Sequence, residues 1–353
     1  MKKNIAKIAT AVTLMGGGSF EATRDQYAAI KTDGGGKLVS VEYADRIDSA
    51  FSIFSDEDVA YEPLIEYTTQ DEVCLNCQTI ACGPKLPPPL PPPPTGAQTV
   101  DWSIAYVHAV EAQKINDGSS VIVGIVDTGI DPDHPDVKAV SCQDFTGSPN
   151  GCRDMQGHGT HVAGSVAAIN NGFGLVGASQ AKIKMAKGLG DNGSGDQVGI
   201  ANAIRYLLRN GAIVISMSLG ATQGSQAIYL AVQEALQAGV QVVAAAGNAG
   251  TSQPNYPAAF PGVKAVSAMD RNFQKANFSS YGNHIWATCP GVQVKSTCKG
   301  GSYCEMSGTS MATPVCAGVL ALSIAAKKPL KFKPMDNAQF FGNGLPLALE
   351  SLQ

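Results

Sequence analysis

The stretch Val121-Ile122-Val123-Gly124-Ile125-Val126 is an uninterrupted apolar run of strand length. Similar runs occur at 212–217 and 240–246, and segments in which apolar residues keep a helical spacing lie between them, at 198–208 and 228–236. Strands that are apolar on both faces and alternate with helices are typical of a parallel sheet with helices on both sides. The sequence therefore predicts an α/β fold in three layers, built around a mainly parallel sheet. In such folds, ligands bind beyond the carboxyl ends of the strands.

Three segments precede this predicted domain, which runs over residues 97–353. Residues 1–19 combine early lysines, a short apolar run and small residues, which is the pattern of a secretory signal peptide; the alternative is an amphipathic start of a cytosolic protein. Residues 20–72 are charged and only moderately apolar, and we expect a small α+β unit there. Residues 73–96 contain a long proline run, which predicts a stiff polyproline II spacer, with a proline-rich SH3 ligand as the alternative.

The composition limits the classes of function. A net charge of −4 over 353 residues argues against nucleic acid as a partner, because phosphate binders usually carry a basic surplus. The sequence has no run of about 18 apolar residues, so it predicts no membrane-spanning helix. Nine cysteines fit an exported protein better than a cytosolic one.

The cysteines fall into three groups. Cys142 with Cys152, and Cys298 with Cys304, are close in sequence and flanked by glycines, so each pair is able to close a small loop. Cys316 lies in an apolar run and is expected to be a buried thiol. The third group has part of the spacing of a zinc site but lacks the fourth ligand of a closed structural site, so we do not expect zinc. It consists of Cys74, Cys77 and Cys82.

Two polar side chains stand at positions that suit nucleophilic chemistry. Ser310 lies in the turn Gly308-Thr309-Ser310-Met311-Ala312-Thr313-Pro314, before an apolar helical run from Val315 to Ala326 whose first turn is expected to hold Pro314. A serine at a helix start is often only a cap, but as a nucleophile its own N–H helps to hold an oxyanion. Asp127 directly follows the first apolar strand, where it either caps the next helix or takes part in the chemistry.

A histidine motif supplies the base that such a serine needs. His158 and His161 stand in Gly157-His158-Gly159-Thr160-His161, at the start of a helical run. Helical zinc motifs separate two histidines by four positions with a glutamate between them, and neither feature is present here. We therefore predict that His158 is a general base and that His161 packs beside it.

The order Asp127, His158, Ser310 is one in which hydrolytic triads occur. On these three motifs the chain resembles the subtilisin-like (subtilase) serine proteases over about residues 97–353, and the resemblance implies their three-layer fold. It implies that Ser310 attacks the scissile carbonyl, that His158 transfers the proton and that Asp127 orients the imidazole. It also implies that Asn248, at the end of an Ala-Ala-Ala-Gly-Asn stretch, donates to the oxyanion.

The resemblance further implies two backbone segments that hold an extended substrate between them, and a residue at the base of the primary pocket. Glycines in these segments let the main chain approach, although loop glycines are common in any protein. The implied substrate-binding residues are Leu189, Gly190, Gly193, Ser194, Gly195, Ser218, Leu219 and Gly220, with Asn255 at the pocket base. Because many relatives have glycine at the Asn255 position, the depth of the pocket stays open.

One structural calcium site is also implied by the resemblance. Six hard oxygen ligands suit Ca²⁺, although the same residues are common in turns. Side-chain oxygens would come from Gln98, Asp136 and Asn171, and backbone carbonyls from Ile169, Phe173 and Leu175. A second, weaker calcium site of the family is expected to be absent.

These features predict a monomeric, secreted or periplasmic endopeptidase that acts on proteins and peptides. Residues 20–72 resemble a short inhibitory propeptide that blocks the enzyme's own site, and the cut that releases it lies either near 67–72 or near Ala97. Two rivals remain: a catalytically silent subtilase fold that serves as a binding module, and an esterase.

Overall fold

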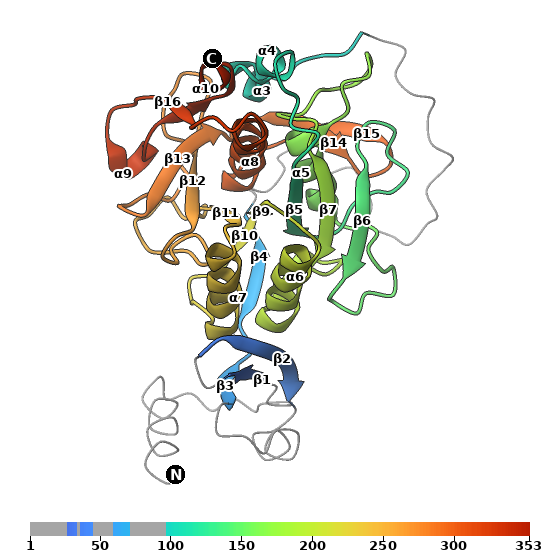
Figure 1. Ribbon diagram of the computed structural model, residues 1–353, viewed down its shortest axis with the longest axis vertical. Helices are drawn as coiled ribbons and strands as arrows, with labels where there is room; N and C mark the ends of the chain where they lie inside the picture. Colours follow the sequence, from blue (N-terminus) through green and yellow to red (C-terminus); the bar gives the residue numbers. More distant parts are fainter. Residues whose placement is uncertain (1–26, 34–35, 45–58, 71–96) are drawn as a thin grey trace.

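The computed structural model describes residues 27–33, 36–44, 59–70 and 97–353. At its centre is a seven-stranded sheet in the order β13-β12-β11-β9-β5-β7-β6, in which all neighbouring strands are parallel (Figure 1). The three predicted strands form its middle, as β5, β9 and β11. The strands are β5 (Ile122–Asp127), β6 (Ala139–Asp144), β7 (Lys182–Lys187), β9 (Val214–Met217), β11 (Gln241–Ala245), β12 (Lys264–Met269) and β13 (Ile285–Pro290).

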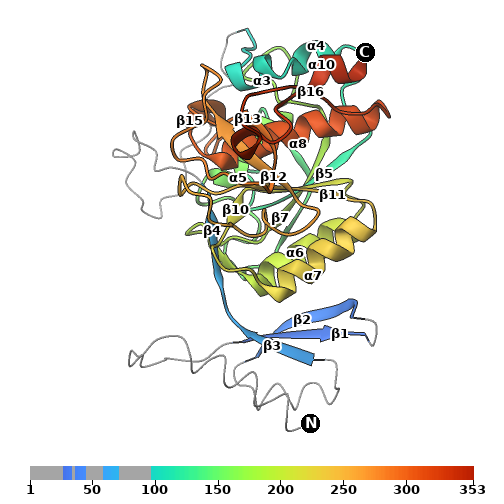
Figure 2. The ribbon, with the colours of Figure 1, turned by 90° about the vertical axis from the view of Figure 1, so that its left-hand side faces the viewer.

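Two long helices cover each face of the sheet, which confirms the predicted three layers (Figure 2). On one face lie α5 (His158–Ala167) and α8 (Thr309–Ala325), and on the other lie α6 (Gln197–Arg209) and α7 (Gln226–Gln237). The helices α6 and α7 begin at side-chain caps, because Asp196 accepts the N–H of Val198 and Ser225 accepts that of Ile228. Each helical layer packs its apolar side chains against the sheet in a core of its own.

A small antiparallel sheet lies on the outer side of α6 and α7, in the order β2-β1-β3 (Figures 1 and 2). Arg205 and Asn202 of α6 donate to the carbonyls of Leu38 (3.3 Å) and Val41 (3.2 Å) in this sheet. The described residues of the predicted α+β unit contain strands and no helix. The predicted signal peptide (1–19) and the whole of the predicted spacer (73–96) lie outside the described residues. The strands are β1 (Tyr27–Thr32), β2 (Leu38–Ala44) and β3 (Val59–Pro63).

The remaining elements are short and surround the large sheet. Among the described helices, none is long and apolar enough to cross a bilayer. The short elements are β4 (Glu66–Thr69), α3 (Trp102–Tyr106), α4 (Ala109–Gln113), β8 (Ser194–Asp196), β10 (Leu219–Gly220), β14 (Val294–Cys298), β15 (Ser302–Met306), β16 (Lys331–Lys333), α9 (Ala338–Phe341), β17 (Leu345–Leu347) and α10 (Ala348–Leu352).

Three disulfides link the described part of the chain. Cys142–Cys152 and Cys298–Cys304 form as the sequence predicts. The prediction of a free thiol at Cys316 is wrong, because Cys316 in α8 is bonded to Cys289 at the end of β13. The packing of α8 on β13 brings their α-carbons within 6.1 Å, across a sequence separation of 27 that gave no local signal.

The start of α8 also differs from the prediction. The helix begins at Thr309, so Pro314 lies inside it and not in its first turn. The side-chain oxygen of Asn248 accepts hydrogen bonds from both the N–H and the hydroxyl of Thr309 (2.9 Å each), which stabilises this early start.

Candidate active site

The four side chains of the predicted site gather at the carboxyl edge of the large sheet. Asp127 is the last residue of β5, and His158 is the first of α5. Ser310 is the second residue of α8, and Asn248 follows the end of β11. Because the strands are parallel, their carboxyl ends meet at one edge, and the loops that follow them bring these residues together.

Asp127 and His158 are paired and fully buried. The Nδ1 atom of His158 lies 2.7 Å from Oδ1 of Asp127, and that oxygen also accepts the N–H of Thr128 (2.7 Å). A carboxylate that accepts from one imidazole nitrogen fixes the tautomer and the ring orientation, and it makes the other nitrogen a better base. His161, on the same helix, lies 3.0 Å from the Val294 carbonyl through Nε2.

A second buried carboxylate, Asp154, holds both halves of this pair in place. Asp154 accepts from the Thr128 hydroxyl (2.9 Å), and so contacts the residue after Asp127. It also accepts the N–H groups of Gly157 (2.7 Å) and Thr160 (2.8 Å), at the start of α5. The sequence predictions did not include Asp154. Its only signal was an acidic residue three positions before the histidine motif.

Ser310 offers a hydroxyl and a backbone donor at the start of α8. Its hydroxyl donates to the carbonyl of Ser218 (3.1 Å), and its N–H is one of the first-turn groups that have no partner within a helix. Asn248 lies next to this turn. Its oxygen is used by Thr309, and its buried Nδ2 has no hydrogen-bond partner among the described residues. The site therefore has two donors, Ser310 N–H and Asn248 Nδ2, that are not needed by the fold.

A segment of the same chain lies in the cleft beside these residues. Strand β4 is antiparallel to β8 on one side and to β10 on the other, so the three form a small sheet. The predicted substrate-binding segments 193–195 and 218–220 thus flank an extended strand. Leu189 and Gly190 lie at the base of the first segment, where their N–H groups donate to the carbonyls of Asp127 and Ser194.

The strand in the cleft ends beside Ser310. The backbone carbonyl of Gln70 accepts the N–H of Ser310 (3.1 Å), and the N–H of Gln70 donates to the carbonyl of Ser218 (3.3 Å). The Gln70 side-chain amide donates to the carbonyl of Gly220 (3.3 Å). A carbonyl of this chain is therefore hydrogen-bonded by the backbone of the predicted nucleophile.

Comparison with known proteins agrees with this geometry. A model of the subtilase family matches residues 118–339. The chain belongs to the subtilase family.

Among similar proteins, the thermostable alkaline protease of Halalkalibacterium halodurans is 45% identical over 230 residues, which are 65% of this chain and 63% of that relative. The match therefore spans less than two thirds of that relative's length. Subtilisin DY of Bacillus licheniformis is 43% identical over 248 residues (68% of this chain and 90% of the relative). Subtilisin Savinase of Lederbergia lenta is 42% identical over 235 residues (66% and 87%).

In this subtilase, the Asn255 side chain lies between Gly220 and Gly247. A Cβ on Gly220 would lie 2.1 Å from Asn255 Nδ2, and a Cβ on Gly247 would lie 3.1 Å from Asn255 Cβ. The Asn255 amide also contacts the carbonyl of Ala245 (3.4 Å), which holds it in place. The Gln70 side-chain amide donates to the carbonyls of Gly220 and Thr68 (3.3 Å each).

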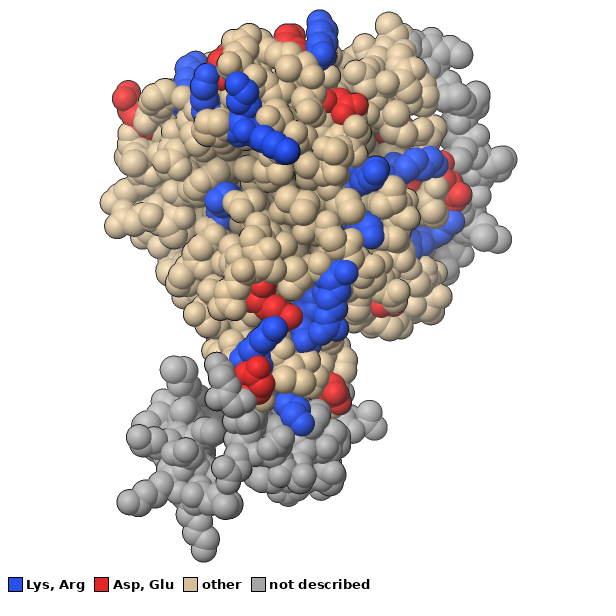
Figure 3. Space-filling model, viewed as in Figure 1, with Lys and Arg blue, Asp and Glu red and all other residues tan. Residues whose placement is uncertain are grey.

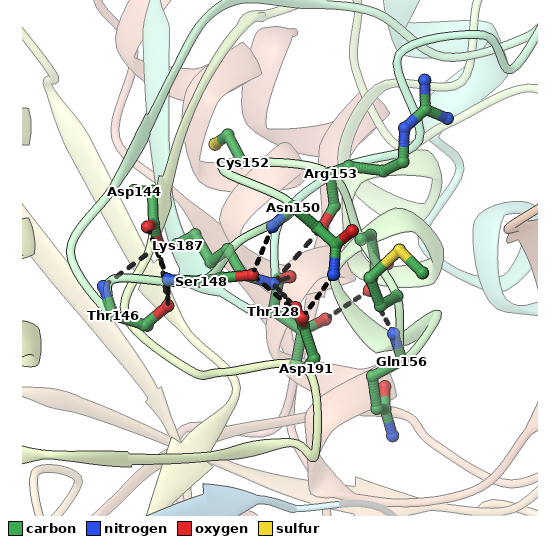
Figure 4. Close-up of polar contacts among 12 residues, drawn as sticks. Thr128, Asp144, Thr146, Ser148, Asn150, Cys152, Arg153, Gln156, Lys187 and Asp191 are labelled. Carbon is green, nitrogen blue, oxygen red and sulfur yellow. Dashed lines mark hydrogen bonds and ion pairs between the residues drawn. The ribbon is translucent and has the colours of Figure 1, made fainter. Parts of the chain in front are cut away.

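A buried lysine supports the loops around the subtilase site (Figure 4). Lys187, the last residue of β7, donates to the carbonyl of Thr128 (2.6 Å) and pairs with Asp191 (2.9 Å). Asp191 also accepts from Ser148 (2.9 Å) and Asn150 (2.8 Å), in the loop that the Cys142–Cys152 disulfide closes. Burial acts to raise the pKa of Asp191, but hydrogen bonds from Lys187, Asn150 and Ser148 and the Lys187 charge outweigh it and hold that pKa below its ordinary value.

The residues predicted to bind calcium converge on one loop. Nε2 of Gln98 donates to the carbonyls of both Ile169 and Leu175 (2.8 Å each), and Nδ2 of Asn171 donates to the Asp136 carboxylate (3.4 Å). Burial raises the pKa of Asp136 to about 6, which indicates a carboxylate short of positive charge.

Two further groups lie close to the Asp136 carboxylate. Gly174 passes so close to Asp136 that a Cβ would lie 2.5 Å from Oδ2, and Tyr303, which the sequence predictions did not include, donates to the same oxygen (3.2 Å). The described part of the chain contains no group of three or more His, Cys, Asp and Glu residues placed so that they could hold a metal ion. Carboxylate, carbonyl and amide oxygens are a donor set that fits Ca²⁺, and binding an ion here would require the Gln98 and Asn171 amides to turn their oxygens, in place of their nitrogens, toward it.

Proposed function

We propose that this subtilase is a serine endopeptidase that is made as a self-inhibited precursor and exported. The observation that carries the proposal is the hydrogen bond from the Ser310 N–H to the Gln70 carbonyl, because it delivers a peptide carbonyl of an extended strand to the predicted nucleophile. The similarity to alkaline proteases and subtilisins supports the same reaction.

In the proposed mechanism, Ser310 Oγ attacks the carbonyl carbon of the substrate. The hydroxyl, which now donates to the Ser218 carbonyl, transfers its proton to Nε2 of His158. Asp127 stabilises the imidazolium through the 2.7 Å contact, and His158 then protonates the leaving amine. Water releases the acyl group from Ser310 by the same steps in reverse.

Two hydrogen-bond donors are proposed to stabilise the negative charge on the tetrahedral intermediate. These are the Ser310 N–H, which already contacts a carbonyl oxygen, and the Asn248 Nδ2, which has no hydrogen-bond partner among the described residues. Loss of one such side-chain donor lowers kcat by a factor of about 10²–10³, a range that comes from subtilisin itself.

Protein and peptide substrates are proposed to bind as β4 does, in an extended conformation between residues 193–195 and 218–220. Backbone pairing of this kind accepts many sequences, because side chains alternate in and out of the cleft. Asn255 is assigned to the base of the primary pocket, where its side chain restricts the depth available to a substrate residue.

Residues 20–72 are proposed to inhibit the enzyme until they are removed. The Glu62 carboxylate accepts from the Ser225 hydroxyl (2.6 Å) and from the N–H of Gln226 (2.8 Å), at the start of α7. A negative charge is favourable at a helix N-terminus. Tyr43 of β2 donates to Asp196 at the start of α6 (2.9 Å), so the small sheet is bound to both helices, while β4 pairs with β8 and β10.

Calcium is proposed as a structural ion, held by Gln98, Asp136 and Asn171 with the carbonyls of Ile169, Phe173 and Leu175. The ion would neutralise the buried Asp136 carboxylate and would join the start of the domain to the 169–175 loop. It supplies no chemistry to the reaction.

Secretion and a monomeric state complete the proposal, with proteins and not nucleic acid as partners. On the face shown in Figure 3, Lys and Arg are scattered among acidic side chains and do not form one continuous basic surface. A catalytically silent module is not favoured, since all four active-site residues are present and Asp127 and His158 are in contact.

The test is casein hydrolysis by the processed wild-type protein and by Ser310→Ala. The proposal expects hydrolysis by the wild type that a serine-directed phosphonate stops, and no hydrolysis by the variant. A folded, processed wild-type protein without phosphonate-sensitive hydrolysis would contradict it.

A further inference from the structure

We infer that the first maturation cut is made at the peptide bond between Gln70 and Asp71, so that residues 71–96 stay on the enzyme as an N-terminal extension. The inference rests on the proposed function and names the bond on which that function first acts. The resemblance left two positions open, one near residues 67–72 and one near Ala97, where Ala97-Gln98-Thr99-Val100 resembles the start of mature subtilisins.

The pairing of β4 selects one carbonyl for the reaction. The Gln70 carbonyl accepts the Ser310 N–H (3.1 Å). Two backbone N–H groups hold the strand just before this carbonyl: that of Gln70 donates to the carbonyl of Ser218 (3.3 Å), and that of Thr69 donates to the carbonyl of Gly193 (3.2 Å). The bond that follows this carbonyl is the one that an attack by Ser310 would break.

The side chains of β4 fix this register. Tyr67 is fully buried, in the same apolar cluster as Leu189 and Leu219, and its hydroxyl contacts the Gln223 carbonyl (3.3 Å). Thr68 is exposed. A shift of one residue would expel Tyr67 from this cluster and bury its neighbour instead, so registers that deliver another carbonyl to Ser310 are disfavoured.

The alternative bond, before Ala97, is held at a different site. The N–H of Gln98 donates to Gly172 (3.1 Å) and that of Thr99 to Gly174 (2.8 Å), and the Gln98 side chain contacts the same loop. These contacts are present while β4 fills the cleft. A first cut before Ala97 would require this segment to break its contacts and displace β4 from both of its neighbouring strands.

The reaction is an ordinary hydrolysis. Ser310 Oγ forms an ester with the carbonyl carbon of Gln70 as the bond to the Asp71 nitrogen breaks, and the proton from Ser310 passes through His158 to that nitrogen. Water then splits the ester and leaves a carboxylate on Gln70. The product strand 59–70 keeps its other contacts in the cleft, so release of the inhibitor is a separate, slower step.

The retained extension would carry the cysteine group 74, 77 and 82 and the proline run of residues 84–94 on the mature enzyme. A cut before Ala97 would remove them.

The test follows the full chain as it processes, by intact mass and N-terminal sequencing over time, with Ser310→Ala as the uncut control. We expect the earliest fragments to be one that ends at Gln70 and one that begins at Asp71. If the earliest new N-terminus is Ala97 or another residue, and the protein hydrolyses casein, this inference is overturned and the proposed function stands. If the chain neither processes nor hydrolyses casein, both are overturned.

A matched pair of variants tests the register. Tyr67→Ala should slow the first cut by about tenfold or more, because it removes the buried anchor of β4. Thr68→Ala, on the exposed side of the same strand, should leave the rate within about twofold. Equal rates for the two variants would contradict the role assigned to the β4 register.

Discussion

The hydroxyl of Ser218 donates a 2.9 Å hydrogen bond to the backbone carbonyl of Ser310. In a regular helix that carbonyl would accept the N–H of the residue four positions later, but this residue is Pro314, which has no N–H. In the opposite direction, the hydroxyl of Ser310 donates to the carbonyl of Ser218 (3.1 Å). The two serines are therefore joined by a reciprocal pair of bonds, and the first of them satisfies a buried acceptor that α8 cannot.

Ser218→Ala should destabilise the fold, because it leaves the Ser310 carbonyl buried without a donor. We expect the free energy of unfolding to decrease by about 1–3 kcal/mol. Thermal unfolding in a Ser310→Ala background measures it without self-digestion. The matched control is Ser216→Ala, since the Ser216 hydroxyl is buried with no hydrogen-bond partner among the described residues. Equal losses for the two variants would show that the Ser218–Ser310 bond contributes nothing specific.

Asn255→Gly should deepen the primary pocket. Removal of the side chain frees the space between Gly220 and Gly247, so large apolar residues gain access to it. The ratio of kcat/KM for peptides with phenylalanine against glutamine before the scissile bond should rise by about tenfold or more, since burial of one large side chain contributes about 1.5–3 kcal/mol. An unchanged ratio in an active variant would show that Asn255 does not limit the pocket.

Asp191→Asn should weaken the loops around the site at neutral pH, because it removes the carboxylate partner of the buried Lys187 ammonium. We expect the free energy of unfolding to fall by about 1–3 kcal/mol. The folded-state pKa of Asp191 is held below its ordinary value, so its stabilising effect is present above that ordinary value and is lost as the pH falls through the folded-state pKa.

The difference in melting temperature between wild type and Asp191→Asn should therefore shrink as the pH is lowered from 7 toward 3. Asp133→Asn is the control, because Asp133 is an exposed partner of Arg153 and its loss should change stability little. A difference that stays constant across this pH range would contradict the assigned role of the Asp191 charge.

Chelation of calcium should lower the melting temperature. A site filled at 100 times its dissociation constant stabilises the fold by about 2.7 kcal/mol. The effect should be reversed by added Ca²⁺ and not by Mg²⁺, because the donor set is flexible and rich in carbonyls. Asp136→Asn should largely remove the response. A wild-type melting temperature that does not respond to chelation would refute the calcium proposal.

Local patterns were enough to predict the centre of this molecule. The apolar runs that form β5, β9 and β11 have few alternatives to a buried parallel strand, and Asp127, His158 and Asn248 lie at strand or helix ends where a motif is readable from neighbouring residues. The two short disulfide loops were predictable for the same reason, because their cysteines are near each other in sequence.

Features that depend on contacts across the fold were not predictable in this way. Cys289 and Cys316 meet only because α8 packs on β13, and nothing near Lys187 in the sequence indicates that its ammonium group is buried. The sequence also left the maturation cut open, because the choice depends on which segment pairs with β8 and β10. Ser218 was expected to act through its backbone. Its side-chain hydrogen bond to Ser310 was not predictable, because the need for it depends on the position of Pro314 within α8.

The central claim is that Ser310 is the nucleophile of a peptide-hydrolysing site. The most direct measurement is the loss of casein hydrolysis as a serine-directed phosphonate is added to the processed enzyme, with the modified residue located by peptide mass. The account predicts one adduct per chain, on Ser310, and a loss of activity in proportion to it. Full casein hydrolysis by fully modified enzyme, or an adduct on another serine that accounts for the loss, would contradict the claim.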